Sequence, residues 1–209
     1  AGDAGTVFGA GLLMSQKHNR KVLSTLALGT RYSDKEIERY IIEKKIHFIK
    51  IGNIAKKTAE LIAGGKVVAW FQGRGEIGAR ALGKRSILAD PRNAKIADYI
   101  NAEIKHREIW RPFACSVQEE EFEKIFKNTK TKKRYPFMIE AFEVKELWVN
   151  RIPAVIHKAD HTSRPQTVNK EDDTLYYGLI ENFKKITGCP LILNTSLNDR
   201  GQPLIMDPQ

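Results

Sequence analysis

Residues 72–117 read QGRGEIGARALGKRSILADPRNAKIADYINAEIKHREIWRPFACSV, a glycine-rich and basic stretch that follows a short apolar run at 67–71. The apolar run is typical of a strand, because β-branched and aromatic residues favour the pleated conformation. Glycines at 73, 75, 78 and 83 would let backbone amides approach a ligand closely. Between residues 72 and 111 there are nine Lys or Arg against five Asp or Glu, and several of the basic residues adjoin a glycine. This arrangement predicts an anion site.

A short helix is predicted inside this stretch. Asp90 or Asn93 can cap it, and Pro91 suits its first turn. Its apolar face is formed by Ile96, Tyr99, Ile100 and Ile104. Lys105, Arg107 and Arg111 follow its end. A guanidinium clamps phosphate oxygens through two parallel bonds and an ammonium adds a mobile charge, so this group suits a polyphosphate or an acyl phosphate. Basic residues at a helix end can also merely oppose its dipole, and spacing alone leaves both interpretations open.

Three blocks of sequence resemble one known family. Residues 72–117 are similar to the signature of the O-carbamoyltransferases of nodulation-factor and antibiotic biosynthesis, which begins Q-G-R-x-E-x-G-x-R-A-L-G. Residues 160–168, DHTSRPQTV, and residues 190–198, PLILNTSLN, resemble two further segments of that family. The sequence departs from the usual pattern at His161 for glycine, Ala79 for proline and Leu197 for phenylalanine. The resemblance covers nearly the whole chain, because a fourth block lies at the N-terminus.

The resemblance implies an α/β fold with a YrdC-like twisted mixed sheet flanked by helices. Lys105 and Arg107 match the K-x-R pattern of YrdC-like domains, and Ser196 and Asn198 match their distant S-x-N pattern. The implied organisation is the tail of an actin-like carbamoyl-transfer domain at 1–17, a linker and connecting helix at 18–46, and a carbamoyl-adenylate-forming YrdC-like domain at 47–209.

The family's activity implies a division of labour among these residues. ATP, carried with Mg²⁺, and carbamoyl phosphate would be the substrates. Lys105, Arg107 and Arg111 would hold carbamoyl phosphate or its product phosphate. The remaining candidates would contact the nucleotide, its phosphates or the carbamoyl amide, and they are Arg80, Arg164, Asn194, Ser196 and Asn198. For each arginine the alternative is an ordinary surface salt bridge, which contributes about 0–1 kcal/mol.

The N-terminal block implies a further domain. The turn expected at residues 2–5 resembles the last nucleotide- and metal-binding motif of the actin-like domain in the same family, where an aspartate corresponding to Asp3 is a metal ligand. Its companions, for a divalent metal such as iron, would come from sequence absent here. An actin-like N-terminal domain of the same polypeptide is therefore the expected partner. Asp3 can alternatively cap the helix that follows it.

The net charge of +10 and pI near 9.6 raise a rival hypothesis, a basic tRNA- or double-stranded-RNA-binding module of YrdC-like fold. Part of the charge is concentrated at 124–134, which is expected to be a solvated loop, and no aromatic stacking platform is identifiable. Nucleic acid is therefore not the expected partner. No segment approaches the ~20 apolar residues that span a bilayer, and no signal peptide is recognised. Cys115 and Cys189 are expected to be reduced, so a cytoplasmic location is predicted.

Secondary structure was predicted from periodicity and capping signals. Helices are expected at 34–45 and from 54 to a Gly64-Gly65 end, where a capping box at Ser33 to Glu36 opens the first and Asn53 can cap the second. Further helices are expected at 119–127 and at 176–186, the latter closed by Gly188. Strands are expected at 47–51, 66–71, 137–142, 153–156 and 191–193. Alternating helices and strands of this kind indicate a mixed α/β sheet.

Overall fold

A computed structural model describes residues 2–15, 23–128, 131 and 134–208 of the chain. Its helices are α1 (Gly2–Met14), α2 (Asp34–Glu43), α3 (Ile54–Ala63), α4 (Ala94–Tyr99), α5 (Phe122–Ile125), α6 (Glu146–Val149) and α7 (Thr174–Thr187). A π-helical turn, η1 (Ile100–Ile104), continues α4, and two 3₁₀ turns are η2 (Glu119–Glu121) and η3 (Pro153–Val155). The strands are β1 (Val68–Phe71), β2 (Arg85–Ala89), β3 (Ala114–Gln118), β4 (Phe142–Glu143), β5 (Thr162–Ser163), β6 (Pro165–Val168) and β7 (Leu191–Ser196).

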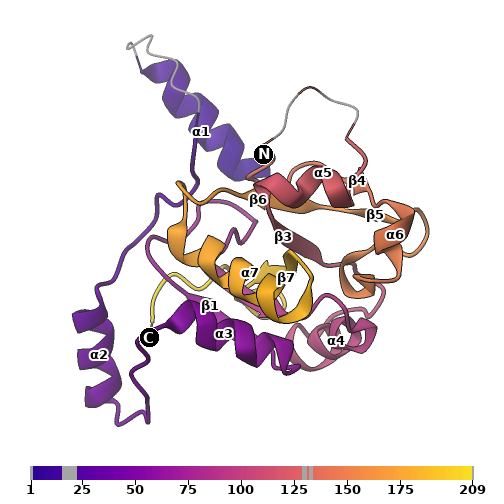
Figure 1. Cartoon of the computed structure of the whole chain (residues 1–209). Helices are drawn as coiled ribbons and strands as arrows, with labels where there is room; N and C mark the ends of the chain where they lie inside the picture. Colours follow the sequence, from indigo (N-terminus) through magenta and orange to yellow (C-terminus); the bar gives the residue numbers. More distant parts are fainter. Residues whose placement is uncertain (1, 16–22, 129–130, 132–133, 209) are drawn as a thin grey trace.

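The main sheet has five strands in the order β1-β2-β7-β3-β6 (Figure 1). Its first three pairings are antiparallel, whereas β3 and β6 are parallel. The C-terminal strand β7 therefore lies in the middle of the sheet, between the two strands of the glycine-rich stretch. This register brings the third sequence block next to the first, and the parallel β3–β6 pair adds the second block beside them.

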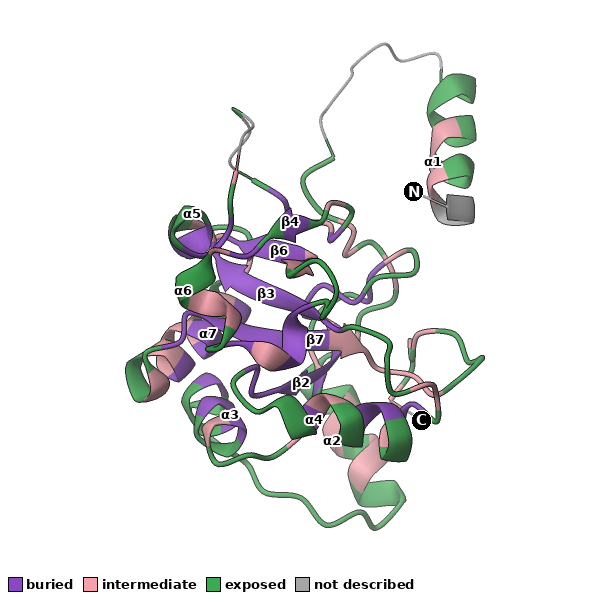
Figure 2. Cartoon of the chain, turned by 90° about the vertical axis from the view of Figure 1, so that its right-hand side faces the viewer, coloured by how far each residue is buried: buried purple, intermediate pink, exposed green. Residues whose placement is uncertain are grey.

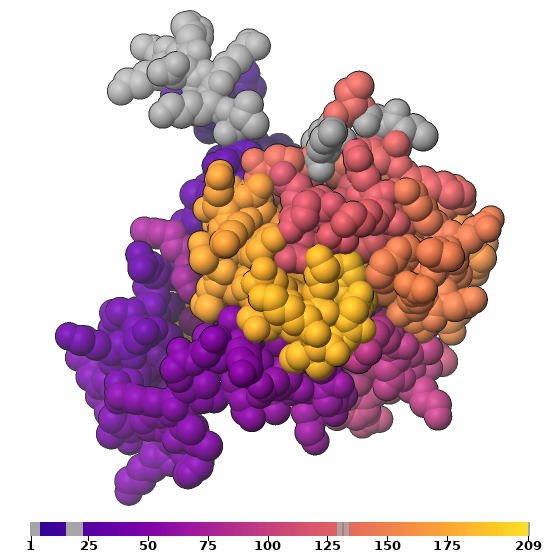
Figure 3. All heavy atoms as spheres, viewed as in Figure 1, coloured from indigo at the N-terminus to yellow at the C-terminus, as the bar shows by residue number. Residues whose placement is uncertain are grey.

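Helices α3 and α7 pack against each other and cover one face of the sheet, with further contacts to β1, β3 and β7. The core between these layers is apolar, and its central side chains are fully buried, including Ile62, Leu88, Leu179, Phe183 and Leu193. Figure 2 shows the central strands in purple, the colour of buried residues. Figure 3 shows the orange-yellow atoms of α7 between the purple atoms of the α3 region and the rose atoms that follow β3. The predicted mixed α/β sheet flanked by helices is confirmed.

The capping signals identified in the sequence are confirmed in the structure. Ser33 and Glu36 form a reciprocal capping box at the start of α2. Asn53 caps α3 and Asn93 caps α4, each by accepting a hydrogen bond from a backbone amide. Gly188 ends α7 in the left-handed conformation, with φ of 73°. These interactions are local, which is why a short sequence pattern is sufficient to predict them.

Three predicted strands are wrong. Residues 47–51 have no regular structure and their side chains are exposed, so no neighbouring strand pairs with them. Residues 137–141 form turns and loop around Met138, whose φ of 52° is incompatible with a strand, and only β4 follows them. Pro153 to Val155 form η3, in which proline occupies the first turn. Apolar character predicted burial at this last site but not the backbone conformation.

The two N-terminal helices, α1 and α2, contribute little to the packed core. The turn expected at residues 2–5 is part of α1, which begins at Gly2, and the side chain of Asp3 lies outside what the structure describes. Figure 2 shows α1 separated from the sheet. Helix α2 contributes no buried residue. None of the helices in the described ranges combines the length and apolar character needed to cross a bilayer.

Candidate functional site

Lys105 lies at the centre of the predicted K-x-R and S-x-N motifs. It follows η1, is 4% exposed, and its Nζ donates to the backbone and side-chain oxygens of Ser196 and Asn198 at 2.6–3.1 Å. Burial, together with the charge of Arg107, lowers the pKa of Lys105 to about 8. The ammonium is thus already held by four protein oxygens. It fixes the turn after β7 and leaves little capacity for direct contact with a phosphate.

Arg80, Arg107 and Arg164 come from three separated segments and line one small cavity, of about 90 Å³, together with Asn194 and Ser196. The remaining wall is formed by Ala79, Ala81, Pro112, Phe113, Ala114, Met138 and Thr195. Here we call this space the arginine cavity. Within the described residues, no ion pair joins Arg80, Arg107 or Arg164 to a carboxylate. Three guanidinium groups that make no direct ion pair with a described carboxylate give this site a concentrated positive charge.

Two of these arginines are partly buried, and Arg107 is held by its neighbours. The Arg107 Nε donates to Asn101 Oδ1 at 2.6 Å and its guanidinium lies 4.8 Å from the centre of the Phe113 ring. Burial lowers the pKa of Arg107, and burial together with the charge of Arg80 lowers the pKa of Arg164. The Nε of Arg164 is buried without a hydrogen-bond partner in the structure. The arrangement has a desolvation cost that a bound anion would offset.

Arg111 is placed differently from the other predicted site residues. Its side chain is 48% exposed, and its Nε pairs with Glu108 at 2.8 Å. It lies near enough to lower the pKa of Arg107, but it is not part of the cavity lining. The structure therefore brings five of the eight predicted residues to the cavity, places Lys105 and Asn198 directly behind Ser196, and leaves Arg111 outside.

Asn194 belongs to a buried polar layer on the sheet. Ser116 and Gln166 are cross-strand partners on β3 and β6, and Asn194 lies on the same face of β7. The Ser116 hydroxyl accepts hydrogen bonds from Asn194 Nδ2 and from the Tyr176 hydroxyl, both at 2.9 Å, and donates to Gln166 at 2.8 Å. The Oδ1 of Asn194 is buried without a partner beside the cavity. That free acceptor can receive a donor such as a carbamoyl amide.

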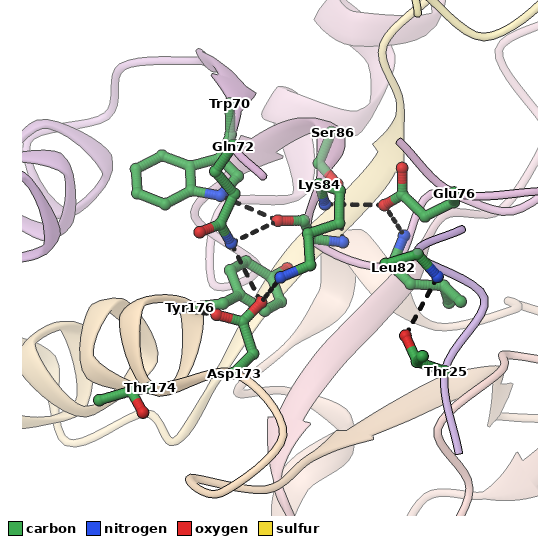
Figure 4. Close-up of polar contacts among 12 residues, drawn as sticks. Thr25, Trp70, Gln72, Glu76, Leu82, Lys84, Ser86, Asp173, Thr174 and Tyr176 are labelled. Atoms are coloured by element: carbon green, nitrogen blue, oxygen red, sulfur yellow. Dashed lines mark hydrogen bonds and ion pairs between the residues drawn. The ribbon is translucent and has the colours of Figure 1, made fainter. Parts of the chain in front are cut away.

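The glycine-rich loop does not use its amides as the sequence predicted. The Oε1 of Glu76 accepts hydrogen bonds from the backbone amides of Leu82, Lys84 and Arg85, at 2.6, 2.7 and 3.3 Å (Figure 4). Glu76 is 1% exposed. The chain's own carboxylate thus occupies the position that an external anion was expected to take. The sequence carried a signal for this role, since Glu76 is the one acidic residue between positions 72 and 85.

Other basic residues of the stretch have structural roles. Arg85 is fully buried, donates to the carbonyls of Thr30, Gln72, Gly73 and Lys84, and lies 3.5 Å from the centre of the Phe71 ring. Arg92 makes a bidentate pair with Asp90. These arginines support the backbone around the site, and their charges face neither the cavity nor a ligand.

A second, larger cavity of about 380 Å³ adjoins the same loop. Leu82, Lys84 and Glu76 contribute to its lining, whereas Arg80 and Ala81 contribute to the arginine cavity. Its lining lysine is neutralised, because Lys84 pairs with Asp173 at 2.5 Å. None of the eight residues predicted for the site on the YrdC-like domain lines it. We therefore place the candidate anion site in the smaller cavity.

Two further expectations concern metals and the basic loop. Among the residues that the structure describes, no group of three or more His, Cys, Asp or Glu side chains could hold a metal ion. The basic loop at 124–134 is described only in part, and there Lys127 pairs with Glu143 while Arg134 pairs with Glu119 and Asp172. His161 has a φ of 53°, so the position usually occupied by glycine retains a left-handed conformation.

Comparison with known proteins agrees with the motifs. The model of the family described as carbamoyltransferase C-terminus matches residues 59–209. The nodulation protein NolNO of Sinorhizobium fredii is 42% identical over 98% of this chain, and NolO of Bradyrhizobium diazoefficiens is 38% identical over 98%. These matches cover 31% and 38% of the two relatives, so the chain spans about a third of their length.

The crystal structure of HypF from T. kodakarensis is similar in fold, with a TM-score of 0.50 and 22% identity over 75% of this chain and 18% of that one. At that identity the likeness supports the fold alone. The family model and the two relatives show the family, since they match the region that contains all three sequence blocks. The chain therefore belongs to the carbamoyltransferase family, whose C-terminal region it contains.

Proposed function

We propose that this domain binds carbamoyl phosphate and ATP at the arginine cavity and forms carbamoyl adenylate. The observation that supports the proposal is the convergence of Arg80, Arg107 and Arg164 on one cavity beside Ser196 and Asn194, where no carboxylate of the described residues pairs with them. Phosphoryl and adenylyl transfers need mainly positioning and neutralisation of charge, and they make little demand for a protein nucleophile. A site built from arginines, amides and a hydroxyl meets that demand.

The proposed reaction releases two phosphate products. Water cleaves carbamoyl phosphate to inorganic phosphate and carbamate, and a carbamate oxygen then attacks the α-phosphorus of ATP. A new bond joins that oxygen to phosphorus, the bond from the α-phosphorus to its bridging oxygen breaks, and pyrophosphate leaves. The arginines stabilise the charge that moves onto the phosphate oxygens. Lys105 holds the Ser196–Asn198 turn in place, and Asn194 Oδ1 can accept a hydrogen bond from the carbamoyl nitrogen.

The cavity volume limits which part of the substrates it can enclose. About 90 Å³ is well below the roughly 300–1,000 Å³ of ordinary ligand pockets, so it accommodates the anionic end of a substrate and leaves the adenosine outside. We expect Mg²⁺ to enter with the triphosphate, because this ion is commonly held by substrate phosphates and waters.

The remaining steps are assigned to other parts of a longer protein. We propose that an actin-like N-terminal domain of the same polypeptide, with Asp3 among the ligands of a divalent metal, transfers the carbamoyl group to an acceptor hydroxyl. Residues 1–17 would belong to that domain and residues 18–46 would connect it to the adenylate-forming part. The acceptor that we propose is a hydroxyl of a glycan or secondary metabolite, as the family resemblance implies, and the two relatives are named as nodulation proteins.

The test is carbamoyl-phosphate-dependent exchange of labelled pyrophosphate into ATP, with Mg²⁺ present. We expect exchange with the parent chain and a large loss of exchange in Arg80→Ala. The matched control is Arg151→Ala, which should exchange as fast as the parent, because Arg151 is an exposed arginine that stacks on Trp148 away from the cavity. Absence of exchange in a folded parent chain would count against the proposal. Tight tRNA binding that has a steep salt dependence, survives Arg80→Ala and ignores ATP would favour the RNA-binding alternative.

A further inference from the structure

Glu76 is buried beneath the loop that carries Arg80. Its Oε1 gathers three backbone amides, those of Leu82, Lys84 and Arg85, and its Oε2 is buried without a partner. A carboxylate has only acceptors, so each of its bonds draws a backbone N–H towards one point. Figure 4 shows Glu76 facing Leu82 and Lys84, with Tyr176 and Asp173 beyond them. The carboxylate thus sets the path of the chain immediately after Arg80.

The carbonyl groups on the opposite side of the same loop are held by side-chain donors. Asn194 Nδ2 donates to the carbonyl of Ala81 at 3.2 Å, and Gln166 Nε2 donates to the carbonyl of Leu82 at 3.0 Å. Gly83, with φ of 92°, lies directly against the ring of Tyr176. The loop is therefore clamped through its amides by Glu76 and through its carbonyls by the polar layer of the sheet.

Arg80 needs this clamping more than an ordinary surface residue does. It faces Arg164, whose pKa is lowered by the charge of Arg80, and no described ion pair offsets the repulsion between them. Like charges would separate if the loop were free to move. Resting on the anion-binding role proposed above, we propose that Glu76 is a positioning residue that holds Arg80 in the arginine cavity without touching the ligand.

The test measures binding of inorganic phosphate to the 209-residue chain by calorimetry, well below the melting temperature of each variant. Arg80→Ala should weaken binding about tenfold to a hundredfold, the range for losing one charge-assisted hydrogen bond. Glu76→Ala should approach that loss and never exceed it. Glu76→Gln keeps the size and one acceptor, so it should restore most of the affinity. In the Arg80→Ala background, Glu76→Ala should change nothing further.

A matched control separates positioning from general stability. Glu121 is another buried carboxylate, bonded to Lys124 and Lys184 far from the cavity lining, and Glu121→Ala should lower the melting temperature without changing phosphate affinity. If the parent and Glu76→Ala bind phosphate equally well while Arg80→Ala binds it more weakly, the positioning role of Glu76 is overturned and the anion site stands. No phosphate binding by the folded parent overturns the anion site and this inference together. If Glu76→Ala does not fold, the same cycle with Glu76→Met decides, because methionine keeps the buried volume but removes the carboxylate acceptor, and additive losses contradict the inference.

Discussion

Replacing Gly83 by alanine should disrupt the loop that separates the two cavities. An added Cβ would lie 2.5 Å from two carbons of the Tyr176 ring, and φ at this position is 92°. The ring cannot withdraw easily, because Tyr176 is fully buried and its hydroxyl is bonded to Ser116. Overpacking costs about 1–3 kcal/mol and a left-handed non-glycine residue about 1–2 kcal/mol, while the less flexible unfolded chain returns about 0.4–1 kcal/mol.

The net destabilisation expected for Gly83→Ala is therefore roughly 1–5 kcal/mol, measured as the free energy of unfolding in urea. Gly65→Ala is the matched control, since its φ is 81° but no atom lies within 4 Å of the added Cβ. The difference between the two variants isolates the collision with Tyr176, about 1–3 kcal/mol. If both variants lose the same stability, the close contact between loop and ring does not exist as described, and the reasoning fails.

Three further predictions concern charge. Affinity for sulfate, an anion whose charge is constant from pH 7 to 9, should fall as pH rises through about 8, because Lys105 is a cation below its lowered pKa of about 8 and neutral above it. Lys105→Met should abolish this fall, and an unchanged profile would contradict the prediction. Asp173→Ala should lower the free energy of unfolding in urea by about 1–3 kcal/mol, since it removes both the ion pair with Lys84 and the cap of α7. Asp173→Asn keeps the cap and should cost less, and equal losses in the two variants would show that the ion pair dominates. Arg164→Met should weaken phosphate binding while leaving stability unchanged or up to about 1 kcal/mol higher, because a buried, partly unbonded cation is removed; a large loss of stability would disagree.

The elements that sequence predicted well are those fixed by neighbouring residues. The capping box at Ser33 and the left-handed glycine at 188 depend on one turn of chain, and both are found where expected. Strands depend on distant partners, and the strand predicted at 47–51 was wrong because no neighbouring strand pairs with it. Strands β2, β3, β5 and β6 were not predicted, and they lie in or at the ends of the sequence blocks that resemble the family.

The site was predictable as a group and not residue by residue. Family motifs indicated that residues of three blocks converge, and the position of β7 between β2 and β3 explains how they do so. The motifs could not show which arginines face the cavity. Arg85 and Arg80 are equally basic in sequence, but the first meets four backbone carbonyls and the second meets open space beside Arg164.

The role of Glu76 changes where the positive charge of this site must come from. In many phosphate-binding loops the backbone amides supply it, and their partial charges do not depend on pH. Here three of those amides are bonded to the chain's own carboxylate, so side chains must supply the attraction instead. Arginines remain charged throughout the physiological range, but Lys105, with its lowered pKa, does not. A loss of binding above pH 7 for an anion of constant charge should therefore trace to Lys105, behind Ser196, and not to the glycine-rich loop.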